Sequence, residues 1–520
     1  TEFGMADKFI IRAIASAYAV SPREVVKKFK ELGDLGKAAS VLHHGKTVKL
    51  EVTDAYDLLR DIAQTGGQGS QEKKIQLLAA ILTRVDAIAA CYVVRIPLDK
   101  LRLGFSETTI LDSLSWMLVG DKSLRTKLED AYNVRPDIGY ISETVKKEGI
   151  QGLSHVRAHV GSPVLAQLCQ RLPNASEMIK KMGTVAVEPK YDGVRVQMHV
   201  TRKKQGAVII STFSRNLERT TDMFPELSQI GKEVDAQEAI LDCEAVGLDP
   251  KTGKITSFQE TSTRKRKHGI CEASKSVPLR FFVFDILYKD GKDFLGTPLS
   301  KRRSILERTV KPGRLLALSP QIVTDDAAVL RNYHNEQLRL GLEGVVVKKW
   351  NSFYEPGRRG FSWVKFKEEE GKDGKLTDTI DAVIMGYYLG EGKRTGFGIG
   401  ALLVGVKKGD HFETVTKIGT GVSDELWKDL RKQLHAIESR NIPTEYGDVH
   451  KTLIPDVWVS PNIIVELAGD DLTKSPTHGA GFAVRFPRLV TIRKDKRPKN
   501  ATTVPELIRM FENQMSHTKR

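Results

Sequence analysis

The 520-residue sequence is poor in cysteine and lacks long apolar runs, and both features exclude whole classes of protein. Its few cysteines lie too far apart for a Cys-x-x-Cys zinc ribbon, and in so long a chain they indicate reduced thiols rather than a disulfide framework. They are Cys91, Cys169, Cys243 and Cys271. No stretch approaches the roughly 18–20 apolar residues of a membrane span, and the beginning of the chain lacks a signal-peptide pattern. The sequence therefore predicts an intracellular protein with no membrane partner.

Positive charge is what the sequence has in excess. Lysine and arginine number 81 against 65 aspartates and glutamates, a net charge of +16. This excess is typical of proteins that bind a polyanion such as duplex DNA, but composition alone favours solubility equally well. Ten basic and three acidic residues lie within 485–520, and a second basic cluster occupies 264–268. Apolar, patterned sequence flanks both segments, so neither is predicted to be a disordered tail.

The pattern of apolar residues changes along the chain and predicts three regions. Residues 6–155 repeat apolar positions with the period of helices, separated by short breakers such as GGQGS at 66–70. From about 160 the period becomes two, with helical segments such as 326–340 between the strands, which indicates an α+β region. A polar linker at 371–378 precedes closely spaced short strands that predict a small β-barrel.

The sequence EPKYDGVR at 188–195 marks a candidate nucleophile. Alternating valines before and after it predict two strands joined by a turn at 189–193, with Lys190 at the mouth of the turn. A lysine attacks only as the free amine, which burial or a nearby cation such as Arg195 can favour. Lys-x-Asp-Gly turns also occur in ordinary surface hairpins, so this motif alone favours the plainer interpretation.

Two further segments place charged side chains where they could serve a nucleotide. In WVKFK at 363–367, alternation puts Lys365 and Lys367 on one face, where two ammonium groups suit an α-phosphate. Glu244 ends one apolar run and Glu343 begins another, and carboxylates are ligands that Mg²⁺ prefers. Taken singly, these residues could equally be a solvated strand face and ordinary surface carboxylates.

Taken together and in order, these segments resemble the motifs of the covalent nucleotidyltransferases, the family of polynucleotide ligases and messenger-RNA capping enzymes. The six matching segments are KYDG at 190–193, FSRN at 213–216, LDCEAV at 241–246, FFVFD at 281–285, EGVVVK at 343–348 and WVKFK at 363–367. The resemblance implies that Lys190 carries AMP and that the ATP-binding residues are Glu188, Arg195, Arg215, Glu244, Phe284, Arg359, Lys365 and Lys367. It also implies a magnesium ion at Glu244 and Glu343. Phe281 and Phe282 remain alternatives for the stacking role of Phe284.

The carboxyl-terminal part continues the resemblance. KRTGFGIG at 393–400 and KIGTG at 417–421 are similar to the oligonucleotide-binding (OB) barrel of these ligases. RKDK at 493–496 is similar to the sixth motif, Arg-x-Asp-Lys, which implies that Arg493, Asp495 and Lys496 orient the β- and γ-phosphates as pyrophosphate leaves.

The helical first region identifies the chain more narrowly. QGSQEKK at 68–74 and KLRLGFSETTI at 100–110 resemble the DNA-binding domain of archaeal and eukaryotic ATP-dependent DNA ligases, and PVLA at 163–166 resembles the entry to their catalytic domain. Such a domain weighs against two alternatives, an RNA ligase and a capping guanylyltransferase. An intact Lys190 weighs against a third, a non-catalytic nucleic-acid-binding protein on a ligase fold.

Three departures from the family pattern qualify this expectation. The chain starts at a point that matches the interior of the family's DNA-binding domain, so we expect a fragment. No Gln-x-x-Ile/Leu-Phe-Phe peptide for a sliding clamp is visible. Neither a four-cysteine zinc site nor a helix–hairpin–helix pair is visible, which favours ATP over NAD⁺.

The sequence thus predicts a multidomain ATP-dependent DNA ligase. We expect an all-α DNA-binding domain at 1–158, an α+β nucleotidyltransferase (adenylation) domain at 159–374 and a β-barrel OB-fold domain at 375–520. The expected cofactors are ATP and Mg²⁺, and the expected partner is nicked duplex DNA. We expect a monomer that is cytoplasmic in a prokaryote or nuclear in a eukaryote.

Overall fold

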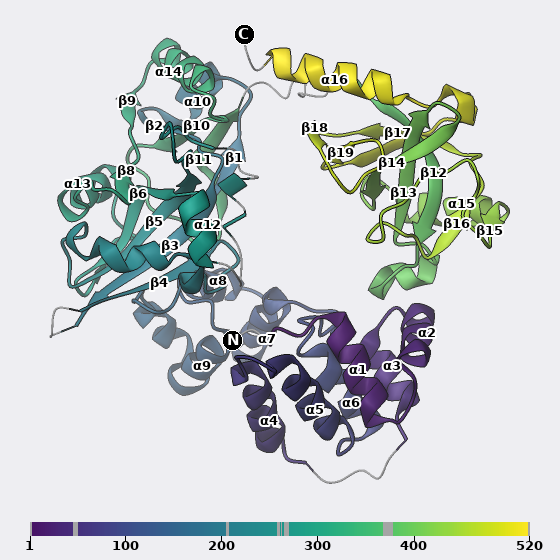
Figure 1. The fold of residues 1–520 in the computed structure, drawn as a ribbon. Coiled ribbons are helices and arrows are strands. Elements are labelled where there is room, and N and C mark those ends of the chain that lie inside the picture. The colour runs from purple at the N-terminus through teal and green to yellow at the C-terminus, as the bar shows by residue number, and fades with distance from the viewer. Residues whose placement is uncertain are drawn as a thin grey trace. The chain divides into compact units, whose positions relative to one another are not determined.

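The computed structural model describes residues 3–44, 50–203, 207–256, 260–261, 263–264, 270–367 and 378–517. The chain forms two compact units (Figure 1). One unit combines Thr1–Gly104 with Gly371–Arg520, and the other is Phe105–Glu370. The predicted linker at 371–378 lies, except for its last residue, outside the described residues.

The first part of the first unit is helical, as its apolar period predicts. Its helices are α1 (Asp7–Ala17), α2 (Pro22–Leu32), α3 (Leu35–Leu42), α4 (Val52–Gln64), α5 (Ser70–Leu82) and α6 (Ala87–Arg95). Local signals set their ends: Ser21 caps α2 ahead of Pro22, Gly33 ends that helix with a positive φ, and Asp34 caps α3. The helices bury one shared apolar core that includes Ile10.

The second part of the first unit is rich in strands. Seven strands form one sheet: β12 (Ile380–Tyr388), β13 (Ala401–Lys408), β14 (His411–Ile418), β15 (Glu438–Ser439), β16 (Val457–Val459), β17 (Ile464–Ala468) and β20 (Arg488–Ile492). Their order is β14-β13-β12-β16-β15, with β17 between β12 and β20, and every pairing is antiparallel. β18 (Asp471–Lys474) and β19 (Phe482–Arg485) form a ribbon. The remaining helices are α15 (Asp424–His435) and α16 (Val504–His517).

The second unit begins with helices and continues with two sheets. Its opening helices are α7 (Glu107–Val119), α8 (Arg125–Val134) and α9 (Ile138–Gly152). The five-stranded sheet has the order β1 (Leu168–Arg171), β11 (Arg359–Lys367), β10 (Gly344–Lys349), β2 (Val185–Pro189) and β9 (Ile322–Thr324). Helices α10 (Ala175–Met182) and α14 (Ala327–Arg339) pack on one face of it and bury Val185, Val187, Val345, Val347 and Val364.

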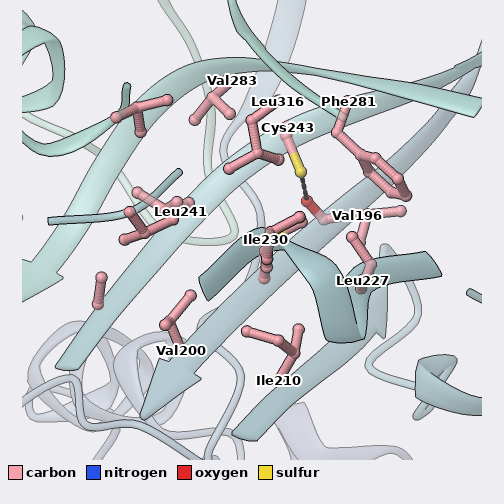
Figure 2. Close-up of a cluster of buried hydrophobic side chains, with 14 of the residues drawn as sticks. Val196, Val200, Ile210, Leu227, Ile230, Leu241, Cys243, Phe281, Val283 and Leu316 are labelled. Atoms are coloured by element: carbon pink, nitrogen blue, oxygen red, sulfur yellow. Dashed lines mark hydrogen bonds between the residues drawn. The ribbon is translucent and has the colours of Figure 1, made fainter. Parts of the chain in front are cut away.

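The six-stranded sheet holds the larger core of this unit. Its strands are β4 (Val208–Ser214), β3 (Val194–Arg202), β5 (Glu238–Gly247), β6 (Leu279–Lys289) and β7 (Lys292–Asp293) in that order, with β8 (Leu316–Leu318) beside β6. Figure 2 shows the core on one face, where Cys243 donates its thiol to the Val196 carbonyl among aliphatic side chains. The predicted valines of β3 all point into this core, so the polar residues of β3 face the other way.

Two observations bear on the cysteine and charge patterns. Cys91, Cys169 and Cys243 are free thiols, while the side chain of Cys271 lies outside the described residues. In the basic cluster at 264–268, residues 265–268 lie outside the described part of the chain. Arg264 is described and is buried, because its guanidinium binds Glu226 and the Val277 carbonyl. Arg264 is therefore paired within the fold, and its charge is not available for a polyanion.

Candidate active site

The candidate nucleophile lies where the chain crosses from one sheet to the other. β2 belongs to the five-stranded sheet and β3 to the six-stranded sheet, so the turn at 190–193 connects the two. The Lys190 amide donates to the Gly344 carbonyl, and its own carbonyl accepts from Glu343. A Cβ at Gly193 would lie 2.5 Å from the Ala245 carbonyl oxygen, so only glycine allows this approach to β5. The predicted turn is confirmed, and the backbone fixes Lys190 at its mouth.

The Lys190 ammonium group is held by Glu343, the residue immediately before β10. Its Nζ contacts Glu343 Oε2, and Lys367 Nζ lies 3.1 Å from the same oxygen. Burial opposes ionisation of Glu343, but the two ammonium groups outweigh it and lower the pKa of Glu343 to about 2. Glu343 therefore stays ionised and orients Lys190.

Lys365 and Lys367 share a face of β11, as strand alternation predicts. Both lysines are half-buried. Val364, before Lys365, and Phe366, between the two lysines, point to the opposite face, into the core under α10 and α14. Burial, together with Arg171, Lys367 and Lys190, lowers the pKa of Lys365. The cluster of cations on this sheet is thus well suited to an anionic ligand.

Arg195, on β3 of the six-stranded sheet, is held in place by several hydrogen bonds. Its guanidinium makes a bidentate pair with Asp242, with Nη2 2.7 Å and Nε 3.1 Å from the two carboxylate oxygens. It also donates to the Gln167 carbonyl at 2.6 Å, while the Tyr354 hydroxyl donates to Asp242 at 2.8 Å. Although burial opposes it, Asp242 raises the pKa of Arg195. Arg195 thus has a fixed position, set by residues that sequence reasoning did not select.

Glu244 is a half-buried carboxyl on β5 in the field of both Lys190 and Arg195. Burial raises its pKa to about 7, although the two cations partly offset this effect. A divalent cation near this carboxyl would favour its ionised form, and oxygen ligands of this kind fit Mg²⁺. In the described part of the chain, no group of three or more His, Cys, Asp and Glu side chains forms a ready metal cluster.

The three phenylalanines of FFVFD have different surroundings. Phe281 is buried in the core of the six-stranded sheet (Figure 2), so it cannot stack on a nucleotide. Phe282 stacks on Tyr191, with ring centroids 4.2 Å apart. Phe284 is half-buried and lies edge-on to Trp363, with centroids 6.0 Å apart. The structure therefore removes Phe281 from the candidates for purine stacking.

Glu188 belongs to a buried ion pair that the sequence did not reveal. Lys348 Nζ donates to Glu188 Oε1 at 2.8 Å, and the two residues are 1 % and 2 % exposed. The same ammonium lies 4.5 Å from the ring centroids of Phe284 and Trp363. Burial raises the pKa of Glu188, an effect that Lys348 partly offsets. The pairing of Val346 with Glu188 brings Lys348, two residues along β10, to this carboxylate, and that register is not visible in the sequence.

Two predicted nucleotide ligands lie apart from these contacts. Arg215 is exposed in the turn after β4, and Arg359 is exposed at the start of β11. Within the described part of the chain, neither arginine forms an ion pair with the cluster of Lys190, Glu343 and Lys367. Their assignment rests on the motif resemblance alone.

The carboxyl-terminal motif forms its own ionic cluster on the other unit. Arg493 pairs with Asp495 at 2.7 Å and with Asp381 at 3.2 Å, and Lys496 also contacts Asp381. A hydrogen bond from Arg493 is the main cause that lowers the pKa of Asp495 to about 2. The motif therefore lies in the turn that follows β20, where its two cations are paired with carboxylates of the same unit.

Models of known protein families match most of the chain. Three family models match: "DNA ligase N terminus" over 1–115, "ATP dependent DNA ligase domain" over 163–367 and "ATP dependent DNA ligase C terminal region" over 395–496. The solved structure named "Pmar-Lig_Pre." shares the fold at 18 % identity and a TM-score of 0.52, with 87 % of this chain and 86 % of that chain covered. Among the described residues, no helix is both long and apolar enough to cross a bilayer.

Three curated relatives extend the similarity to nearly the full length. A "Probable DNA ligase" of Dictyoglomus thermophilum is 40 % identical over 99 % of this chain and 88 % of its own. The "DNA ligase" of Caldivirga maquilingensis is 36 % identical over 99 % and 88 %, and "DNA ligase 1" of Methanosarcina barkeri is 36 % identical over 98 % and 94 %. Because this similarity runs through the helices, both sheets around Lys190 and the strand-rich end, the chain belongs to the ATP-dependent DNA ligases, enzymes that use ATP to join DNA.

Proposed function

We propose that Lys190 is the nucleophile through which this ligase seals nicks in duplex DNA. The observation that carries the proposal is the position of Lys190 at the crossover between two unlike sheets. One sheet supplies Glu343, Lys365 and Lys367, and the other supplies aromatic rings and Glu244. A nucleotide that lies between them would have its phosphates beside the cations and its base beside the rings.

In the first step, the Lys190 nitrogen attacks the α-phosphorus of ATP. The N–P bond forms, the bond from the α-phosphorus to the oxygen bridging the β-phosphate breaks, and pyrophosphate leaves with that electron pair. Only the free amine attacks, so the Lys190 ammonium first gives one proton to water, and the nitrogen gives a second proton to water as the N–P bond forms. Glu343 Oε2, which contacts the nitrogen, stays ionised and orients it. Lys365 and Lys367 stabilise the charge on the α-phosphate. A magnesium ion, held by Glu244 and Glu343, would neutralise phosphate charge.

The remaining residues have binding roles in this proposal. Glu188 accepts a hydrogen bond from the adenine amino group, and Phe284 stacks on the base. The ribose and phosphate side is contacted by Arg195, Arg215, Glu244 and Arg359. In the next steps, the AMP passes from Lys190 to an oxygen of the 5′-phosphate at the nick, and the 3′-hydroxyl then attacks that phosphate and displaces AMP.

The carboxyl-terminal motif completes the first step in this scheme. Arg493 and Lys496 place cations at the β- and γ-phosphates, while Asp495 holds Arg493 in place. They lie on a different compact unit from Lys190, so closure of the two units would bring them to ATP and opening would admit DNA.

The organisation that we propose has three functional domains. They are the DNA-binding helices at 1–158, the adenylation domain at 159–374 and an OB-fold at 375–520. We infer a monomer that acts inside the cell on nicked duplex DNA, without assigning a sliding-clamp partner.

Labelling with ATP tests the assignment directly. Incubation with α-labelled ATP should leave label on the denatured protein, and peptide mapping should locate it on Lys190. Label on another residue, or none, would refute the proposal.

A further inference from the structure

Tyr191, the residue after the nucleophile, contacts the sheet opposite to the one that carries Lys190. Its ring stacks on Phe282 of β6, with centroids 4.2 Å apart and planes inclined by only 17°. Tyr191 is therefore anchored to the six-stranded sheet by this ring stack.

This contact joins the two sheets that must be aligned with each other at the site. Lys190 and its partner Glu343 belong to the five-stranded sheet, whereas Arg195, Glu244 and Phe284 belong to the six-stranded sheet. In-line attack requires Lys190 to keep a fixed position relative to both sheets, because in the proposed scheme Lys365 and Lys367 hold the phosphate while Arg195 and Phe284 of the other sheet hold the ribose and base. A misplacement of about 1 Å in such a reaction can cost about 100-fold in rate.

The stack also limits what Phe282 can do. One face of its ring is covered by Tyr191, and the Arg280 guanidinium lies 5.8 Å from its centroid. Phe284 lies two residues along the strand. Among the described residues, no aromatic ring stacks parallel to it. Phe282 is therefore better placed to hold the turn than to stack on a purine.

We propose that Phe282 is a positioning residue that acts through Tyr191 to set the distance between the Lys190 amine and the nucleotide. The proposal rests on the assignment of Lys190 as the nucleophile. It concerns the first reaction step only, because sealing of a nick that already carries AMP does not use the Lys190 amine as a nucleophile.

The test compares Phe282→Leu, which removes the ring, with Phe282→Tyr, which keeps it. For each variant, the rate of lysyl-AMP formation from α-labelled ATP is measured in a single turnover at saturating and limiting ATP. Sealing of a pre-adenylated nick and the melting temperature are measured on the same preparations. Tyr191→Leu and the double variant with Phe282→Leu complete a double-mutant cycle.

We expect Phe282→Leu to lower the saturated adenylation rate by about 10- to 100-fold, with the ATP concentration for half-maximal rate unchanged. Phe282→Tyr should stay within about threefold of the parent chain because the aromatic face is kept. The double variant should be no slower than the slower single variant, because both substitutions remove the same contact. Sealing of the pre-adenylated nick should be unaffected.

Three results would overturn the proposal. A rise in the ATP requirement with an unchanged saturated rate would make Phe282 a base-binding residue. An equal loss in both steps, with a lowered melting temperature, would make it merely structural, and adenylation at the parent rate would give it no role. Undiminished labelling of Lys190→Arg would instead refute the nucleophile itself, whatever Phe282→Leu does.

Discussion

The Lys190 site and the Arg493 cluster are both built from paired charges, yet only the first contains a pair that is shut off from water. The side chains of Glu188 and Lys348 are 3 % and 2 % exposed. Those of Lys190 and Glu343, at 23 % and 24 %, are about as exposed as those of Arg493 and Lys496, at 23 % and 30 %. A buried pair cannot separate without leaving an uncompensated charge, which is costly, while a hydrated pair exchanges partners with little loss. The Glu188–Lys348 pair is therefore suited to form a fixed wall of the nucleotide site, and the Arg493 cluster is suited to meet the nucleotide and leave.

The pKa values of carboxyl groups shift in opposite directions within the Lys190 site itself. Burial raises the pKa of Glu244 to about 7. At Glu343 the contacting ammonium groups outweigh burial, and at Asp495 the hydrogen bond from Arg493 dominates, so both have a pKa lowered to about 2. Desolvation dominates at Glu244, and direct pairing with a cation dominates at the other two carboxyls.

The largest expected effect comes from removal of the nucleophile. Lys190→Arg keeps the charge and the contact with Glu343 but has no attackable amine, since arginine stays protonated. Labelling with AMP should fall by more than about 1,000-fold, while sealing of a pre-adenylated nick should survive in part. Lys349→Arg, at an exposed position at the end of β10, is the matched control and should label normally.

Loss of the exposed motif should slow one step selectively. Arg493→Ala combined with Lys496→Ala should lower the rate of enzyme adenylation by about 100-fold, because pyrophosphate would leave without its cations. Sealing of a pre-adenylated nick should change far less, and Arg488→Ala, which removes an exposed arginine of the preceding strand β20, should spare adenylation. A defect confined to the pre-adenylated nick would mean that the motif only adds DNA affinity.

Breaking the buried Glu188–Lys348 pair should lower the stability of the protein. Lys348→Met leaves the Glu188 carboxyl buried without its cation, so the free energy of unfolding should fall by about 3 kcal/mol. The double variant with Glu188→Gln should recover most of this loss, since no charge then remains buried. Denaturant unfolding of the single and double variants measures both effects, and equal losses in the two would contradict the account of a stranded charge.

The smallest expected effect is the contribution of Glu244 to the pH dependence of stability. Between its ordinary pKa of 4.5 and its folded value of about 7, the folded protein binds the proton more tightly than the unfolded chain. Ionisation of Glu244 therefore lowers the free energy of unfolding by about 2 kcal/mol as the pH rises through this range. Burial lowers the pKa of His199 to about 3, which acts in the opposite direction over the same range, so the expected effect is the difference in slope between the parent chain and Glu244→Gln. Urea unfolding in EDTA at pH 5 and pH 7.5 measures it.

Asp495 provides the opposite control for that measurement. Its stabilising contribution is present above its ordinary pKa of 3.8 and is lost as the pH falls toward 2. Asp495→Asn should therefore leave the slope between pH 5 and pH 7.5 unchanged. A loss of the slope in this variant would assign the effect to the wrong cluster.

Much of the site could be predicted because the signals were local. Alternation placed Lys365 and Lys367 on one face and turned Arg195 away from the valines of β3, and the structure confirms both. The predicted helical region and the predicted strand-containing regions are also confirmed for the described residues. Choice among the phenylalanines of FFVFD was not local, because it depends on which face of β6 meets the core.

The sequence by itself determined the periods, the turns and the order of the motifs, because these depend on neighbours within a few residues. Only the tertiary structure decided which charges neutralise one another. Lys348 meets Glu188, Arg195 meets Asp242 and Arg264 meets Glu226 across 160, 47 and 38 residues of chain. Pairs of this kind arise because a charge that folding removes from water needs a partner of opposite sign, and strand register supplies that partner from a distant part of the chain.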